Sequence, residues 1–208
     1  MQALLQSALS LEGLAVVLAL AYLLLAARES LWCWVCALLS SLLYMWLMWQ
    51  SRLYMETALN GFYAVMAFAG LQQWMRGGSN GQGVAIVSLR PVHHAACVAL
   101  TLLLALANGA LMQRFTDAAW PFVDSFITWG SVLTTFLVVR KVLENWLYWI
   151  VLDGIAIVVY IERGLWLTAL LFAAYVVIVV FGYLRWRTLY LTQRAAGTAG
   201  TEMRADGN

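Results

Sequence analysis

The chain has 208 residues, of which 64% are hydrophobic and only 11% are charged, and its mean hydropathy is +0.82. Because an ordinary soluble domain carries about a quarter charged residues, this composition predicts that a lipid bilayer is the solvent. The net charge of +2 comes from scattered residues, which argues against a nucleic-acid-binding surface and against an acidic tail.

Apolar runs between charged or glycine-rich breaks predict an all-α integral membrane protein with seven transmembrane helices. A helix needs about 20 mostly apolar residues to cross a bilayer core of about 30 Å. Runs close to this length cover residues 8–27, 31–49, 54–75, 93–112, 118–139, 145–161 and 165–186. These spans leave no room for a soluble enzymatic domain. We expect the first span to remain in the mature protein, because residues 1–7 lack the positive charge of a signal peptide.

Lys and Arg residues are distributed unevenly between the two sides of the predicted membrane protein. Three lie on the side of the N-terminus and nine on the opposite side. Since cytoplasmic loops carry the excess of positive charge, we expect the C-terminus in the cytoplasm and the N-terminus outside. The tail at residues 192–208 is rich in Gly, Ala, Thr and charge, and we expect it to be disordered.

An internal repeat is found when the chain is aligned with itself after a shift of 112 residues. Spans one to three then align without a gap with spans five to seven. The alignment pairs Arg28 with Arg140, Trp34 with Trp146, Tyr63 with Tyr175, Gly70 with Gly182 and Trp74 with Trp186. The chain therefore divides into a first three-helix repeat at 8–75, a glycine-rich loop and connecting helix at 76–117, and a second three-helix repeat at 118–187.

The odd number of spans makes the two repeats parallel. Four crossings separate span one from span five, so both spans enter the membrane from the same face. Parallel repeats are a recurring architecture of secondary transporters, whose substrate sites lie near the bilayer midplane between the repeats. The predicted fold is thus a 3+1+3 parallel repeat. A duplication that only stabilises a helix bundle is the alternative.

The sixth span carries polar and aromatic residues at helical spacing. Asn145, Trp149 and Asp153 share one face, and Trp146 lies three residues before Trp149. Asp153 lies about 12 Å deeper in the membrane than Asn145, at 1.5 Å per residue. Indole faces attract cations and a buried carboxylate favours positive charge, so this face predicts a site for a flat, hydrogen-bonding, cationic ligand. An interfacial aromatic belt is an equal alternative for Trp146 and a weaker one for Trp149.

The fifth span carries a polar stripe. Asp124, Thr128, Ser131 and Thr135 follow one another at helical spacing, which is typical of a wet or substrate-facing wall. Asp124 and Thr128 are therefore candidates for substrate contact. For Asp124, a structural charge that complements the dipole at the start of the helix is an equally good interpretation.

The second and third spans add four candidates. Asn60 and Tyr63 lie on one stripe of span three, and an amide in the middle of a membrane needs a partner. Span two contributes Tyr44 and Trp34, the repeat mate of Trp146. Ordinary helix packing is the alternative for Tyr44.

Catalytic and metal-binding chemistry is not expected. Cys33 and Cys36 form a C-x-x-C, but Cys97 stands alone and gives no second dithiol to exchange electrons with. His93 and His94 start span four without a third metal ligand. We therefore expect no enzyme, no cofactor and no metal.

Several motifs at these positions belong to one known pattern. Its specific element is Glu144-Asn145-Trp146-x-x-Trp149, preceded by Arg140-Lys141. Supporting elements are Trp120-x-x-x-Asp124-Ser125, the Leu53-Tyr54 start of span three, Gly70-x-x-x-Trp74, Gly164 and Gly182-x-x-x-Trp186. With these motifs the chain resembles the PnuC family of bacterial vitamin transporters from span one to span seven.

The resemblance implies facilitated uptake of a vitamin across the bacterial inner membrane, without a coupling ion, by a homotrimer. It implies that the substrate stacks near the paired tryptophans and is trapped by cytoplasmic phosphorylation, with nicotinamide riboside as the first candidate substrate. Thiamine and riboflavin are carried by similar relatives. Asn60 and Leu71 depart from residues common in the family, Gln and Trp, which weakens the substrate assignment more than the family assignment. A membrane assembly subunit without transport is the alternative from a different class.

Overall fold

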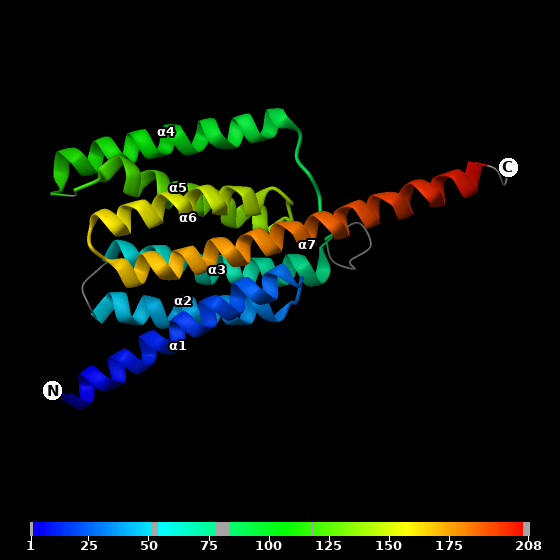
Figure 1. Cartoon of the computed structure of the whole chain (residues 1–208). Helices are drawn as coiled ribbons and strands as arrows, with labels where there is room; N and C mark the ends of the chain where they lie inside the picture. Colours follow the sequence, from blue (N-terminus) through cyan, green and yellow to red (C-terminus); the bar gives the residue numbers. More distant parts are fainter. Residues whose placement is uncertain (1, 51–53, 78–83, 118, 206–208) are drawn as a thin grey trace. The chain divides into compact units, whose positions relative to one another are not determined.

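The computed structural model describes residues 2–50, 54–77, 84–117 and 119–205 (Figure 1). Every regular element in this part of the chain is an α-helix, which confirms the predicted all-α fold with seven helices. The helices are α1 (Gln2–Ala27), α2 (Trp32–Gln50), α3 (Tyr54–Arg76), α4 (Pro91–Phe115), α5 (Pro121–Val139), α6 (Asn145–Glu162) and α7 (Trp166–Ala205).

Five of the described helices are long and apolar enough to cross a membrane. They are α2, α4, α5, α6 and the segment Thr168–Ala196 of α7. Within α1, Leu11–Ala27 forms a shorter apolar helix. The length of α3 is sufficient, but its sequence includes Asn60, Gln72 and Gln73, which lower its hydropathy.

Two compact units divide the chain. Unit 1 comprises Met1–Val84 and Val138–Arg140, and unit 2 comprises Ala85–Leu137 and Lys141–Asn208. In unit 1, α1 packs on α2 and α2 packs on α3, whereas in unit 2 α6 packs on α7. The connecting helix α4 belongs to unit 2. Of the predicted glycine-rich loop, residues 78–83 lie outside the described part of the chain.

The turn between the first two helices of each repeat has the same backbone geometry. Glu29 has a φ of 55° and its repeat mate Lys141 has a φ of 50°, a left-handed conformation that is uncommon outside glycine. The same backbone hydrogen bond closes each turn, from Ser30 N to Leu25 O at 2.9 Å and from Val142 N to Leu137 O at 2.9 Å. The sequence repeat is therefore also a repeat of local structure.

An extended segment before α4 is fastened to the turn between α5 and α6 within unit 2. The amide of Val87 donates to the carbonyl of Lys141 at 3.0 Å, and the amide of Leu143 donates to the carbonyl of Val87 at 2.8 Å. The Glu144 carboxylate accepts hydrogen bonds from the Ser88 hydroxyl and the Leu89 amide. We call residues 86–90 the strap.

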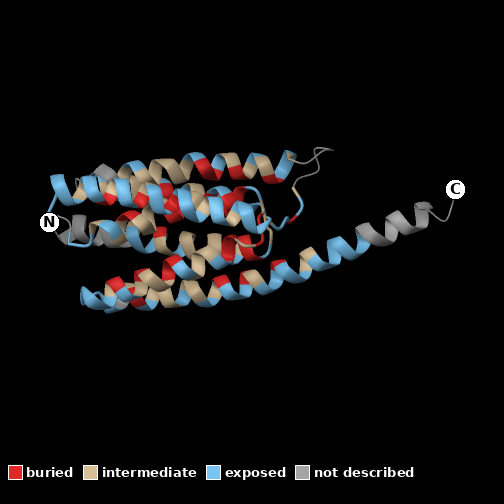
Figure 2. Ribbon diagram, turned by 90° about the horizontal axis from the view of Figure 1, so that it is seen from above, coloured by how far each residue is buried: buried red, intermediate tan, exposed pale blue. Residues whose placement is uncertain are grey.

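Small residues form the inward face of α4. Thr101, Ala105 and Gly109 are buried at four-residue intervals, and a Cβ on Gly109 would overlap Phe122 of α5. Most large apolar side chains of α4 are exposed, including Leu103 and Leu106. Figure 2 shows the same pattern of buried and exposed residues along the other helices. Apolar side chains on the outside and small ones inside are what a helix surrounded by lipid requires.

The last helix is longer than the sequence predicted. α7 continues to Ala205, whereas a disordered tail was expected from residue 192. The hydroxyls of Thr188 and Thr192 donate to carbonyls four residues earlier, and alanines of high helix propensity follow at residues 195 and 196. The C-terminal part of α7 extends beyond the other helices of unit 2 (Figure 1).

Candidate functional site

The first repeat contains a packed pair of tryptophans. The rings of Trp34 on α2 and Trp74 on α3 meet edge to face, with centroids 5.2 Å apart and planes at 88°. A Cβ on Gly70 would overlap the Trp34 indole, so only glycine allows α3 to approach this ring. The Trp74 indole donates to the carbonyl of Val139 at 3.1 Å, and Trp34 is 2% exposed.

The second repeat contains the equivalent pair. The rings of Trp146 on α6 and Trp186 on α7 are 5.3 Å apart at 88°, and Trp146 is 2% exposed. A Cβ on Gly182 would lie 2.8 Å from the Trp146 indole. Each of these two arrangements, here called a tryptophan-glycine lock, places a tryptophan of the W-x-x-W position or its mate inside the helix packing.

Both predicted tryptophans, Trp34 and Trp146, are thus structural elements of their units. Their indole N–H groups have no hydrogen-bond partner within the described part of the chain. Contact of either side chain with a substrate remains a prediction. The aromatic-belt alternative does not describe these positions, because a belt tryptophan faces the membrane interface rather than the protein interior.

The face of α6 that carries the other predicted residues is largely buried. Asn145 is 0% exposed and Asp153 is 7% exposed, while Trp149 between them is half-buried. The Asn145 amide donates to the carbonyl of Val142 at 2.6 Å, which orients the side chain at the first turn of the helix. Its carbonyl oxygen has no partner among the described residues.

The two predicted carboxylates differ in their surroundings. Asp124 and Arg163 form an ion pair at 3.3 Å, and both side chains are about one-third exposed. Asp153 forms no ion pair or hydrogen bond within the part of the chain that the structure describes. Since an unpaired buried charge is costly, Asp153 is the carboxylate with an unmet need for a positive partner. The ion pair favours the structural interpretation of Asp124.

The polar stripe of α5 directs its hydroxyls toward its own backbone. Thr128 donates to the carbonyl of Asp124 at 2.9 Å, and Thr135 donates to the carbonyl of Ser131 at 2.7 Å. Such bonds satisfy a threonine within its own helix. Thr128 therefore remains a candidate only for contact through a hydroxyl that already has an acceptor.

The predicted residues of unit 1 have partners of their own. Asn60, Tyr63 and Tyr44 are half-buried, and the Tyr63 ring lies 5.6 Å from that of Phe62. Ser41 is buried, and its neighbour Ser40 donates to the carbonyl of Ala15 at 2.9 Å. A role for Asn60, Tyr63 and Tyr44 in binding stays a prediction.

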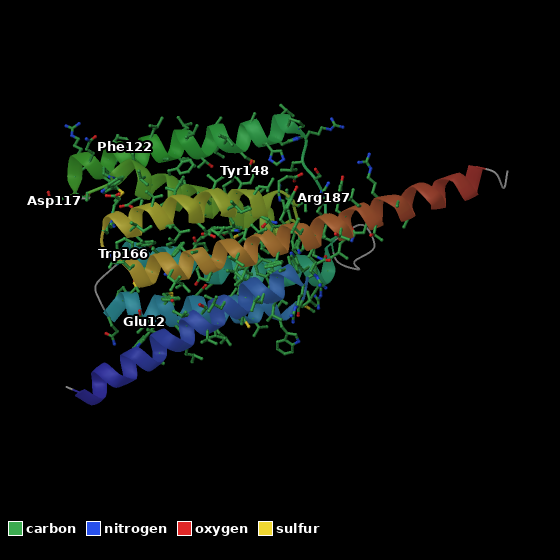
Figure 3. All side chains as sticks on the ribbon, viewed as in Figure 1. Glu12, Asp117, Phe122, Tyr148, Trp166 and Arg187 are labelled. Atoms are coloured by element: carbon green, nitrogen blue, oxygen red, sulfur yellow. The ribbon has the colours of Figure 1, made fainter. Side chains whose placement is uncertain are left out.

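Unit 2 contains a cavity of about 430 Å³ between α4, α5 and α6. Its walls are apolar, with Val98, Val151 and Leu152 among them, and none of the ten predicted residues lines it. At its polar rim, His94 Nδ1 lies 2.9 Å from the Tyr148 hydroxyl and the two rings are stacked (Figure 3). With so few polar groups, the cavity suits an apolar group better than a polar vitamin.

Two features of the site were missed in the sequence. The contact of His94 with Tyr148 joins residues that are 54 positions apart, and nothing in the spacing signals it. Thr134 is fully buried, and its hydroxyl has no partner among the described residues. A signal for Thr134 was present, because its repeat mate is Tyr22, a residue of a quite different size.

The described chain has the properties of a polytopic membrane protein built on a helical repeat. It belongs to the nicotinamide mononucleotide transporter family, whose family model matches residues 9–188. The fold is similar to that in the crystal structure of the vitamin B3 transporter PnuC. The TM-score is 0.69 at 20% sequence identity, covering 88% of this chain and 82% of the other. The predicted resemblance to the PnuC family is thereby confirmed.

Two curated relatives carry different transport names. The nicotinamide riboside transporter PnuC of Escherichia coli (strain K12) is 29% identical over 89 residues, which span 43% of this chain and 37% of that protein. The riboflavin/roseoflavin transporter RibM of Streptomyces davaonensis is 23% identical over 174 residues, covering 82% of this chain and 81% of the relative. The family is thus a family of membrane transporters.

Proposed function

We propose that the chain is a uniporter that takes up a small vitamin across the bacterial inner membrane, with nicotinamide riboside as the preferred substrate. The observation that carries the proposal is the pairing of Trp149 with Asp153 on α6. Asp153 is 7% exposed and has no ion-pair partner in the described chain, and Trp149 lies one helical turn before it. An indole ring and an unpaired carboxylate together suit a cationic aromatic ring such as pyridinium.

The remaining α6 residues suit the rest of such a substrate. The free carbonyl oxygen of Asn145 can accept a hydrogen bond from a carboxamide or a ribose hydroxyl. Asn60 and Tyr63 of α3 would supply further hydrogen bonds, and Trp146 would flank the ring. The mechanism is alternating exposure, in which one three-helix repeat rocks against the other around a central site.

The proposal includes an orientation, an assembly and a trapping step. The three-to-nine division of Lys and Arg residues supports a cytoplasmic C-terminus. The resemblance to the PnuC family supports a homotrimer and cytoplasmic phosphorylation of the arriving substrate, which keeps uptake running without a coupling ion.

Riboflavin is the second candidate substrate, because the match to RibM covers more of this chain than the match to PnuC of E. coli. Thiamine is a third candidate, since its thiazolium ring is also cationic. The buried carboxylate of Asp153 separates these candidates. It favours the two cations and gives no advantage to neutral riboflavin.

Purified protein in proteoliposomes tests the proposal directly. We expect uptake of nicotinamide riboside to stop when the inside and outside concentrations are equal, and to be unchanged by a sodium or proton gradient. A thermal-shift panel with nicotinamide riboside, thiamine and riboflavin should show the largest stabilisation with nicotinamide riboside. Absence of both uptake and stabilisation with all three compounds would favour an assembly subunit and would end the proposal.

A further inference from the structure

The ring that packs against the first lock has no counterpart in the second repeat. Tyr22 on α1 lies against Trp34, with ring centroids 6.2 Å apart and planes at 52°. The shift of 112 residues places Thr134 at the position of Tyr22. Both residues lie five positions before the end of their helices, Ala27 and Val139, so the two helices match in register here.

The hydroxyl of Thr134 behaves unlike those of its neighbours on α5. Thr128 and Thr135 both donate to carbonyls four residues earlier. Thr134 is 0% exposed, yet its hydroxyl has no partner within the described residues. A buried polar group without a partner is destabilising and calls for an explanation, of which a ligand is one.

Two more buried polar atoms without partners begin α6 in the same unit. They are the carbonyl oxygen of Asn145 and the indole N–H of Trp146. Repeat symmetry places Thr134 beside Trp146, because Tyr22 lies beside Trp34. Together the three groups offer one acceptor, one donor and one hydroxyl that can do either. A ring that carries a carboxamide or hydroxyl groups can satisfy all of them.

We propose that Thr134 is a specificity-determining residue, and that the substrate ring takes in the second repeat the place that the Tyr22 phenol takes in the first. This inference rests on the proposed function and deepens it. In the first repeat the protein supplies its own ring to the tryptophan, so that position is closed to a ligand. In the second repeat a small hydroxyl side chain leaves the tryptophan to be covered by the substrate.

The burial of these groups sets a condition on binding. Thr134, Asn145 and Trp146 are all at most 2% exposed, so a ligand reaches them only after neighbouring side chains move. Movement of this kind accompanies alternating access. The described conformation is therefore the closed one with respect to this part of the site.

Substitutions at position 134 separate a role in binding from a role in packing. Thr134→Tyr restores the ring of the first repeat, and we expect it to lower nicotinamide riboside uptake at least about tenfold, because the two rings compete for one place. Thr134→Val keeps the shape but removes the hydroxyl, and we expect the KM to rise about three- to tenfold, the loss of one hydrogen bond. Thr134→Ser keeps the hydroxyl and should stay within about twofold of the unsubstituted chain.

Thermal stability supplies the readout that a packing role would not give. Thr134→Val removes a buried group without a partner, so the Tm without ligand should be unchanged or higher. The increase in Tm on adding nicotinamide riboside should nevertheless be smaller than in the unsubstituted chain. Tyr22→Phe is the matched control in the first repeat, and its uptake should stay within about twofold.

The outcomes distinguish this inference from the proposed function. If the unsubstituted chain transports none of the three vitamins, the proposed function fails. If it transports nicotinamide riboside and Thr134→Val keeps both its KM and its ligand-induced increase in Tm, the inference fails while the function stands. Thr134→Val also decides the matter if Thr134→Tyr does not fold, and uptake by folded Thr134→Tyr at the unsubstituted rate would overturn the inference.

Discussion

The two repeats are alike where they build structure and different where they could bind a solute. Both have a left-handed residue in the turn, and both have a tryptophan-glycine lock with ring planes at 88°. The polar face of α6 has no equivalent in α2. The pairs that differ are Cys33 and Asn145, Ala37 and Trp149, Ser41 and Asp153, and Tyr22 and Thr134.

This difference separates two classes of residue in a duplicated membrane protein. A residue kept in both copies serves a geometric need that both copies share, such as the close approach of two helices at Gly70 and Gly182. A residue present in one copy serves a need that arises once, and binding of one solute is such a need. By this criterion Trp149 and Asp153 are stronger binding candidates than Trp146.

The largest effect is expected for Trp149→Ala, which makes α6 match α2 at this position. Uptake of nicotinamide riboside should fall at least about 30-fold, because truncation of a central tryptophan in a binding site commonly costs 2 kcal/mol or more. Size-exclusion chromatography should show the same folded protein. Trp166→Ala is the control in unit 2, since Trp166 is 66% exposed, and it should transport normally. Near-normal uptake by Trp149→Ala would remove the basis of the comparison.

Gly70→Ala and Gly182→Ala test the shared structure. Each methyl group would meet a tryptophan of the same lock, and overpacking of this kind destabilises by about 1–3 kcal/mol. We expect a similar fall in Tm for both variants. Gly154→Ala is a suitable control, because a Cβ there meets no atom within 4 Å. A fall in Tm for only one of the two locks would show that they are not equivalent.

Asp153→Asn tests the charge that only the second repeat carries. Affinity for cationic nicotinamide riboside should fall about tenfold, because the charge is removed while the shape is kept. Affinity for riboflavin, measured by competition, should be unchanged. The first-repeat control is Ser41→Ala, which should bind both compounds as before. Equal losses for the cation and the neutral compound would mean that Asp153 does not act through charge.

The smallest effect is expected for Asp124→Asn. Its ion pair with Arg163 is about one-third exposed on each side, and partly exposed pairs contribute about 0–1 kcal/mol. The Tm should fall slightly at low salt and the difference should shrink in high salt, as screening predicts. Transport of nicotinamide riboside should be nearly unchanged. A loss as large as that of Asp153→Asn would place Asp124 in the binding site.

Much of the fold could be predicted because helical membrane proteins show it in their hydropathy. The seven helices and the repeat register followed from apolar runs and from the Arg, Trp, Tyr and Gly matches. Helix ends were less predictable. Pro121 begins α5 three residues after the expected start, since proline is favoured in the first turn. The last turns of α7 were missed because a charged alanine-rich segment is compatible with both helix and disorder.

The candidate site could be predicted only where its residues follow one another on a helix. Asn145, Trp149 and Asp153 follow from four-residue spacing alone. The partner of Asp124 lies 39 residues away, and the acceptors of Ser88 and Leu89 lie more than 50 residues away, so periodicity gave no signal for them. Thr134 could have been found by asking where the two aligned repeats differ.

The strap has a consequence for biogenesis. Its hydrogen bonds join Val87 and Ser88 to residues 141–144, and Ser88 and Glu144 are 56 positions apart. Because a ribosome makes the chain from the N-terminus, these bonds cannot form until α4 and α5 have been synthesised and the next turn has emerged. The connecting helix must therefore wait in the translocation machinery or the lipid, unfastened, while α1 to α3 have every residue they need to assemble among themselves.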